Sequence, residues 1–191
     1  MSWMRTIVGG VLLTAACAGG AAAQSLEELN GGGTPSRPTP DLKSVARQII
    51  QRTNQFREDQ GREPTSSNPE LMKTAADFAH YMARHDKYGH TADGRRPSQR
   101  ASQHGYRYCI IAENIAYQYS SQGFGGKQLA RRFFQGWKHS PEHRKNMLDR
   151  DVTETGVAVA HSESSGAYYA VQMFGRPKSK QIKFQVVNRG A

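Results

Sequence analysis

Residues 137–148 read WKHSPEHRKNML and join two expected helices. Serine followed by proline and then an acid is a typical helix start, because proline fits the first helical turn and the acid lies at the positive end of the helix dipole. The helix expected over 127–138 therefore gives way at Ser140 to a short helix that runs through Leu148. His143 falls in the first turn of that short helix, where the dipole disfavours an imidazolium and keeps the ring neutral.

The same kind of signal predicts helices upstream of this stretch. Apolar residues recur every three to four positions over 41–59, which is typical of an amphipathic helix, with Asp41 as its N-cap. Asn68, followed by proline and glutamate, opens a second helix. Its expected buried face consists of Leu71, Ala75, Phe78, Ala79 and Met82. A short helix over 97–104, ended by Gly105, follows.

Two β-prone runs lie downstream, at 155–161 and 167–174, around the turn Ser-Glu-Ser-Ser-Gly. Such a pattern predicts an antiparallel hairpin. The order helix, helix, loop, helix, hairpin predicts an α+β domain in which helices pack on a small antiparallel sheet.

The composition limits the class of protein. A chain of 191 residues with 37% hydrophobic residues is long enough for one compact domain with appendages. Two cysteines cannot build a disulfide scaffold or a cysteine-based zinc module. These numbers exclude a multidomain machine, a polytopic membrane protein and a knottin-like toxin.

The formal net charge is +10, which favours anionic partners such as envelope polymers or phospholipid headgroups. We expect the basic clusters to form a solvated face rather than a specific site. These clusters are Arg95-Arg96, Arg100, Arg107, Arg131-Arg132, Arg144-Lys145 and the tail from Arg176 to Lys183. Few aromatic residues lie between the basic ones, so we expect no specific binding of nucleic acid.

The N-terminus has the parts of an exported protein. Residues 1–23 combine Arg5, a short apolar centre and an Ala-Ala-Ala end, which predicts a signal peptide and a secreted or periplasmic protein without a transmembrane segment in the mature chain. The alternative is a lipoprotein signal with Cys17 as the anchor. Residues 24–40 read as a Gly/Pro-rich linker, 41–176 as the domain and 177–191 as a basic tail.

Cleavage after residue 23 leaves Cys109 as the single cysteine. Since Cys109 lies in the apolar run 108–112, we expect it to be buried as a small hydrophobic residue.

Three polar groups stand where apolar ones would serve packing better: His90, Glu113 and His143. A carboxylate inside the apolar run around Glu113 either closes a loop or pairs with a histidine, whose tautomer it would fix. His139 lies four residues before His143, but the helix start between them places the two on different elements. Ser140, close to His143, is the one candidate for a serine nucleophile.

These segments, taken in this order, resemble the CAP superfamily (cysteine-rich secretory proteins, antigen 5 and pathogenesis-related 1), in particular its short bacterial exported branch. The resemblance covers about residues 41–176. The matching residues are Asn54, Arg57, Leu71, Ala75-Ala76, Met82-Ala83, His90, Asp93-Gly94, Pro97, Arg100, Gly105-Tyr106, Glu113-Asn114-Ile115-Ala116, Trp137, Ser140-Pro141, His143-Arg144, Asn146-Met147-Leu148, Thr155-Gly156-Val157, Gln172 and Phe174-Gly175.

The resemblance implies an α-β-α sandwich with a central cleft on which two histidines and two acids converge. Carried over by motif, the cleft positions are His90, Glu113, Ser140 and His143, with serine where eukaryotic members have the second acid. It implies that His90, Glu113 and His143 can hold a divalent cation such as zinc, more weakly than a site with two acids, because a hydroxyl is a poorer ligand than a carboxylate. No cofactor is required.

Two functions follow as hypotheses. The first is an exported, non-enzymatic binding domain, expected as a monomer, whose unknown ligand is a lipid or an anionic envelope polymer; the resemblance contributes lipids and sterols as a ligand class. The second is a metal-assisted hydrolase that acts on peptides or cell-wall material. The sequence assigns no catalytic residue, and no nucleophile–base–orienter set is evident.

Overall fold

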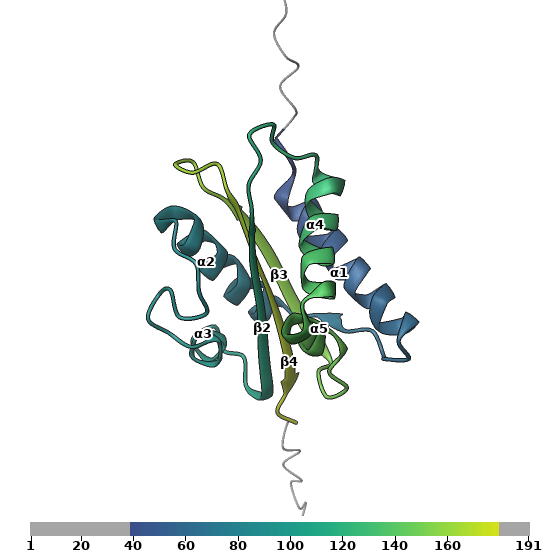
Figure 1. The fold of residues 1–191 in the computed structure, drawn as a ribbon. Helices are drawn as coiled ribbons and strands as arrows, with labels where there is room; N and C mark the ends of the chain where they lie inside the picture. Colours follow the sequence, from purple (N-terminus) through teal and green to yellow (C-terminus); the bar gives the residue numbers. More distant parts are fainter. Residues whose placement is uncertain (1–38, 180–191) are drawn as a thin grey trace, which may run out of the picture. The chain divides into compact units, whose positions relative to one another are not determined.

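The computed structural model describes residues 39–179, in which a four-stranded sheet lies between two layers of helices (Figure 1). The helices are α1 (Leu42–Asp59), α2 (Pro69–His85), α3 (Pro97–Gln103), α4 (Gly126–His139) and α5 (Pro141–Leu148). The strands are β1 (Ser66–Ser67), β2 (Tyr108–Gln118), β3 (Glu154–His161) and β4 (Tyr168–Pro177).

The strands follow the order β1-β3-β4-β2, so that β2 lies at one edge of the sheet. The expected hairpin forms as the antiparallel pair β3–β4. Strand β2 then pairs antiparallel with β4, whereas the short β1 pairs parallel with β3. The expected small antiparallel sheet is confirmed for β2, β3 and β4, and the two-residue β1 adds a parallel pair that makes the sheet mixed.

The helices begin where their caps predict. The Asp41 side chain accepts a hydrogen bond from the backbone N–H of Lys43 at 3.0 Å, and the Asn68 side chain accepts one from the N–H of Leu71 at 3.0 Å. Ser140 stands at the start of α5, but its side chain makes no capping hydrogen bond. Proline at the first position of α5, whose fixed φ suits a helix start, supplies the remaining signal.

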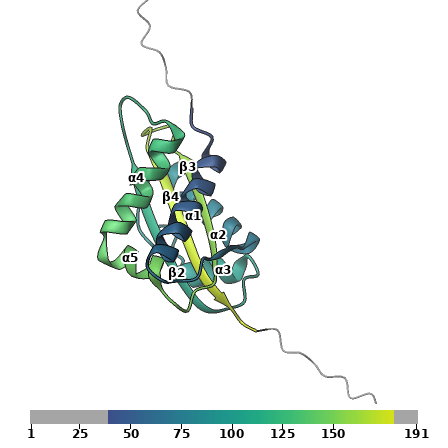
Figure 2. The ribbon, with the colours of Figure 1, turned by 90° about the vertical axis from the view of Figure 1, so that its right-hand side faces the viewer.

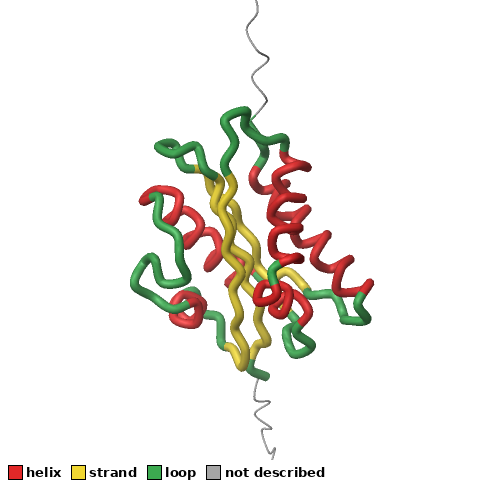
Figure 3. The backbone as a smooth tube through the Cα atoms, in the orientation of Figure 1, coloured by secondary structure: helices red, strands yellow, loops and turns green. Residues whose placement is uncertain are grey.

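Each face of the sheet is covered by its own helices. Helices α1, α4 and α5 pack on one face, and α2 and α3 pack on the other (Figures 1 and 2). The tube view separates the same two helical layers from the strands between them (Figure 3). Side chains of β4 alternate between the two cores, with Ala170 and Phe174 in one and Val171 and Met173 in the other. The expected α-β-α arrangement is thereby confirmed.

Helix α2 lies unusually close to β3. A Cβ atom added at Gly156 would lie 2.2 Å from the carbonyl carbon of Leu71 and 2.4 Å from the backbone nitrogen of Met72. Only glycine allows this approach of helix to strand.

Arg57 fixes the segment that follows α5. This buried guanidinium donates hydrogen bonds to the carbonyl oxygens of Met147 at 2.7 Å, Asp149 at 3.0 Å and Val152 at 3.2 Å. Burial lowers the pKa of Arg57, although Asp149 nearby opposes this effect. The end of α5 is thus tied to α1 by hydrogen bonds that span about ninety residues of sequence.

Cys109 is exposed, so the expectation of a buried cysteine is wrong. The register of β2 with β4 shifts between Tyr108 and Ile110, and Cys109 falls at this irregularity without a partner on β4. A bulge of this kind turns one side chain out of the regular alternation.

The expected signal peptide, the lipoprotein anchor at Cys17, the linker up to residue 38 and the tail from residue 180 lie outside the described residues. In the part of the chain that the structure describes, no helix has the length and apolar character needed to cross a membrane.

Candidate functional site

The candidate residues gather at the free edge of β2. The loop after α2 approaches this edge from one layer, and α5 approaches it from the other. Because neighbouring side chains of a strand point to opposite faces, Glu113 faces the α2 layer with Ile111 and Ile115, and Asn114 faces the α4 layer with Ala112.

A buried network of charges surrounds Glu113. One carboxylate oxygen, Oε1, lies 2.8 Å from Nδ1 of His90, and the other, Oε2, accepts a hydrogen bond from Arg100 at 2.7 Å. Arg100 also donates to the carboxylate of Asp93 at 2.8 Å. The side chains of Glu113, Arg100 and Asp93 are at most 3% exposed, whereas that of His90 is 50% exposed. The imidazole of His90 is therefore exposed to solvent, whereas the charged side chains that hold it in place are buried.

Arg100 is the centre of this network, and its assignment to a solvated basic face is wrong. Its guanidinium lies 3.5 Å from the centre of the Phe78 ring and donates to the backbone carbonyl oxygens of His90 at 2.9 Å and Arg95 at 2.7 Å. The loop that carries His90 thus folds around a buried cation. The sequence did not reveal this role, because Arg100 lies close to Arg95 and Arg96, and several basic residues in a short segment are typical of an exposed surface.

The contact with Glu113 fixes the state of the His90 ring. A carboxylate can only accept at this distance, so Nδ1 of His90 carries a proton. The other ring nitrogen, Nε2, is then unprotonated in the neutral ring and can accept a hydrogen bond. For Asp93, burial alone would raise the pKa, but the backbone N–H of Arg95 and the charge of Arg100 outweigh it and lower the pKa of that carboxyl.

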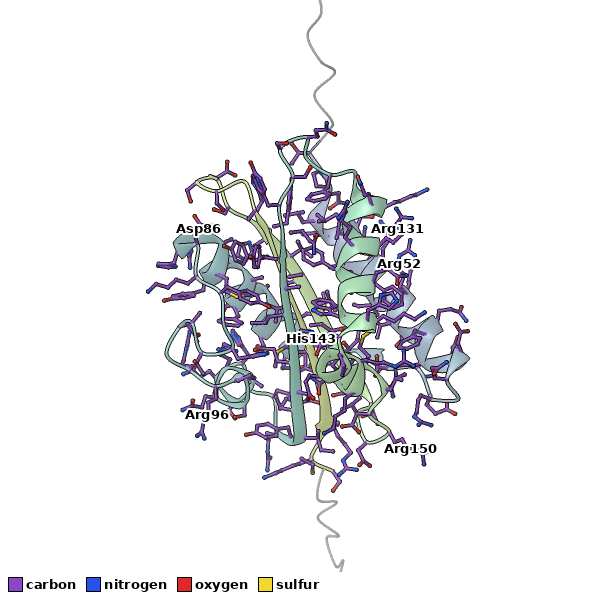
Figure 4. The ribbon with its side chains drawn as sticks, in the orientation of Figure 1. Arg52, Asp86, Arg96, Arg131, His143 and Arg150 are labelled. Atoms are coloured by element: carbon purple, nitrogen blue, oxygen red, sulfur yellow. The ribbon has the colours of Figure 1, made fainter. Side chains whose placement is uncertain are left out.

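His143 comes to the same edge from α5 (Figure 4). Its Nδ1 atom is buried and has no hydrogen-bond partner among residues 39–179. Burial lowers the pKa of His143, and the nearby His90 lowers it further, so the ring is neutral at pH 7. The two imidazoles are therefore electrostatic neighbours that reach β2 from opposite layers.

Buried amides hold α5 against β2. The Asn114 side chain donates to the carbonyl oxygen of His143 at 3.2 Å and to Gln172 at 3.3 Å, and Gln172 donates in turn to Thr53 at 3.0 Å. Asn146 donates to Asn114 at 2.9 Å and to the carbonyl oxygen of Glu113 at 3.3 Å. Sequence reasoning quoted Asn114 and Asn146 in the family motif but gave them no role.

Side chains from both layers also meet at one backbone atom of β2. The carbonyl oxygen of Ile115 accepts hydrogen bonds from the Trp137 indole and the Tyr88 hydroxyl, each at 3.1 Å. Trp137 comes from α4 and Tyr88 from the loop after α2, so this oxygen joins the two layers at the edge of the sheet.

Ser140 and His139 take no part in the network. Within residues 39–179 no hydrogen bond joins the Ser140 side chain to His143, which gives no support to a serine nucleophile. His139 ends α4, where its Nδ1 contacts the Gln135 carbonyl oxygen at 2.9 Å. As expected, His139 and His143 lie on different helices.

The donor set does not fit the three-ligand metal site that the resemblance implies. Among the described residues no group of three or more histidine, cysteine, aspartate or glutamate side chains is arranged to hold a metal ion. Each oxygen of Glu113 already accepts one hydrogen bond, from Arg100 or His90, and the carboxylate is 1% exposed, so it lies behind His90 and leaves the two imidazoles as candidate ligands.

The fold agrees with the comparison to known families. The model of the CAP family, the cysteine-rich secretory protein family, matches residues 50–174. The chain belongs to this family.

Individual relatives are distant. The chain is 25% identical over 144 residues to the uncharacterized protein YkwD of Bacillus subtilis, and it spans about half the length of that curated relative, 51%, with 75% of its own. Among solved structures, an outer surface protein of Borrelia burgdorferi is similar with a TM-score of 0.63 and 19% identity, over 72% of this chain and 96% of that one.

An extracellular protein of Bacillus anthracis that contains an SCP domain is similar with a TM-score of 0.59 and 23% identity, over 70% of this chain and 41% of that one. The CAP domain of enterococcal PrgA is similar with a TM-score of 0.55 and 18% identity, over 75% and 66% of the two chains. These structures share the fold with the present chain.

Proposed function

We propose that this chain is an exported, non-enzymatic binding domain whose β2-edge site, made of His90, Glu113, Arg100 and His143, binds a polar group of a cell-envelope component. Export is supported by the signal-peptide pattern of residues 1–23 and by the Bacillus anthracis relative, which is described as extracellular.

One observation carries the proposal: the Glu113 carboxylate is held on both oxygens. A general base must be able to take a proton from water or substrate, and a metal ligand needs a free lone pair that faces the ion. His90 and Arg100 each donate to one oxygen, at 2.8 and 2.7 Å, and because the Glu113 side chain is 1% exposed, its remaining lone pairs do not face solvent. The carboxylate therefore serves to orient His90.

The resulting surface suits recognition. Nε2 of His90 is an acceptor when the ring is neutral and a donor when it is protonated, and His143 lies beside it as a neutral ring. Hydroxyl, phosphate and carboxylate groups of envelope lipids and polymers match such a pair. The net charge of +10 favours the anionic ones.

The test is binding of the purified chain to isolated peptidoglycan and to phosphatidylglycerol vesicles. We expect His90→Ala to weaken retention on at least one of them about fivefold. His85→Ala is the matched control, because His85 is exposed at the end of α2. Equal retention of the wild type and both variants would contradict the assignment of the site.

Metal-assisted hydrolysis is the competing function, and the same preparations test it. Chelator-treated protein with added zinc should release no fragments from peptidoglycan or peptides. Turnover that returns with zinc and disappears in Glu113→Gln would overturn the non-enzymatic proposal.

A further inference from the structure

A second candidate site lies at the far end of β2, away from Glu113 and its neighbours His90 and His143. The C-terminal end of α2, the last residues of β2 and the β3–β4 turn border a shallow, open hollow of about 380 Å³. We call it the tyrosine hollow; its lining residues are Asp86, Tyr117, Tyr119, Ser165, Ala167 and Tyr169.

Exposed aromatic rings gather at this place. Tyr88, Tyr117 and Tyr119 are 50%, 53% and 62% exposed, and they are the exposed large hydrophobic side chains of the part of the chain that the structure describes. The Tyr117 ring lies 5.2 Å from that of Tyr88 at 68° and 6.0 Å from that of the buried Tyr169 at 30°. The three rings are therefore not stacked in parallel, and those of Tyr117 and Tyr169 line the hollow.

Asp86 supplies a fixed negative charge beside these walls, at the end of α2 next to the β3–β4 turn (Figure 4). Its backbone is held in the left-handed region, with φ of 46°, which non-glycine residues rarely adopt. The carboxylate accepts hydrogen bonds from the hydroxyls of Ser164, Ser165 and Tyr169, the second at 2.6 Å. The hydroxyls of Ser164, Ser165 and Ser162, with a smaller effect of Tyr169, lower the pKa of Asp86 to about 2.

The exposed ring faces and the Asp86 carboxylate are the features that a ligand of this hollow would meet. The Ser164, Ser165 and Tyr169 hydroxyls already donate their protons to Asp86, so they offer a ligand acceptors only. A cation needs only ring faces and negative charge, and the hollow offers both in Tyr117, Tyr119 and Asp86. Glu163 in the same turn, with a side chain 95% exposed, adds a further negative charge.

We propose that the tyrosine hollow binds a compact organic ammonium group, such as the trimethylammonium group of choline. Tyrosine faces attract cations through the ring quadrupole, and the Asp86 carboxylate supplies the counter-charge. The hollow of about 380 Å³ has room for a group of this size. This site is independent of the β2-edge site and of the function proposed for it.

The test titrates the full chain with choline and with 3,3-dimethylbutanol, its uncharged isostere, and follows tyrosine resonances by NMR. We expect saturable binding of choline and at least tenfold weaker binding of the isostere. Tyr119→Leu should weaken choline binding about fivefold through the lost cation–π contact. Tyr81→Leu is the control, because Tyr81 lies on α2 away from the hollow, stacked on His85.

Asp86→Asn tests the charge, because asparagine also tolerates the left-handed backbone. It should weaken choline binding several-fold and leave binding of the isostere unchanged. If this variant loses the fold by circular dichroism, Tyr117→Leu replaces it, with the weakening expected for Tyr119→Leu. Equal affinity for choline and the isostere, or no saturable binding of choline, would overturn the proposal.

A last arm identifies the source of the ammonium group. Retention on phosphatidylcholine vesicles that free choline displaces would assign a lipid headgroup. Binding of choline without retention on the vesicles would assign a small solute. Either result supports an ammonium site.

Discussion

Among the single residues of the site, Arg100 supplies the buried positive charge that pairs with both buried carboxylates. It is one cation between two buried carboxylates, Asp93 and Glu113, and the carbonyl oxygens of the neighbouring loop satisfy its remaining donors except Nε. Breaking a buried ion pair is costly, because removal of one partner leaves the other as a buried charge that neither water nor a counter-charge stabilises.

Replacing Arg100 therefore tests the network directly. Arg100→Met should lower the free energy of unfolding by about 3–5 kcal/mol at pH 7, since it removes the buried cation beside Glu113 and one of the two guanidinium partners of Asp93, the other being Arg95. Urea denaturation followed by circular dichroism measures this. Arg131→Met, the same change at an exposed position of α4, should cost under about 0.5 kcal/mol. A loss of similar size in both variants would contradict the network.

His143 gives a pH-dependent prediction. Its pKa is lower in the folded chain than the ordinary 6.5, so the unfolded chain takes up the proton first. The stability that the neutral ring contributes is present above about pH 6.5 and is lost as the pH falls toward the folded pKa. Urea denaturation at pH 7.5, 6.5 and 5.5 should show a steeper loss of stability in the wild type than in His143→Gln. Parallel curves would contradict burial of the ring.

The candidate residues His90, Glu113 and His143 could be picked out from the sequence, but the buried ion pairs that hold them in place could not. His90, Glu113 and His143 stood out because a polar group in an apolar run, or in a helix start, calls for a partner. Arg100 and Asp93 did not, because their partners lie on another element and only the folded chain brings them together. Sequence patterns reveal contacts between residues that are close along one helix or strand, but not contacts between residues on different elements.

At the scale of elements, the helices were predictable and the longest strand was not. Caps and prolines are local signals, and they place the starts of α1 and α2 correctly. In β2 both faces are covered, so the strand reads as an apolar run without alternation, which suits a buried helix equally well. Glu113 and Asn114 interrupt that run next to each other, since each faces a different layer.

Two glycines give a matched test of how closely elements pack. Gly156→Ala should lower the free energy of unfolding by more than about 3 kcal/mol or prevent folding, because the new Cβ would overlap the α2 backbone at Leu71. Gly136→Ala, inside α4 with open space around it, should raise the free energy of unfolding by about 1 kcal/mol. Thermal and urea denaturation measure both.

The outcome that contradicts this view is specific. A Cβ atom at Gly156 would lie 2.2 Å from the carbonyl carbon of Leu71. If Gly156→Ala were as stable as Gly136→Ala, α2 and β3 would have to lie farther apart than this distance implies.

The whole molecule carries a net charge of +10, and its binding to anionic surfaces should follow. Retention on phosphatidylglycerol vesicles should fall steeply between about 50 and 300 mM salt, where the screening length drops below about 10 Å. Reversing the exposed pair on α4, Arg131→Glu with Arg132→Glu, should weaken retention more than the neutral pair Arg131→Gln with Arg132→Gln. Retention that salt does not change would contradict an electrostatic contribution.

The carbonyl that Trp137 and Tyr88 share has a consequence for association. An outer strand ordinarily offers bare amide groups on which another chain can extend the sheet, a common route to aggregates. On β2 the carbonyl oxygens of Glu113 and Ile115 are already bonded by side chains from helix and loop. The residues that hold the two layers together thus also take up two carbonyl oxygens of this edge, which makes it a poorer template for a further strand.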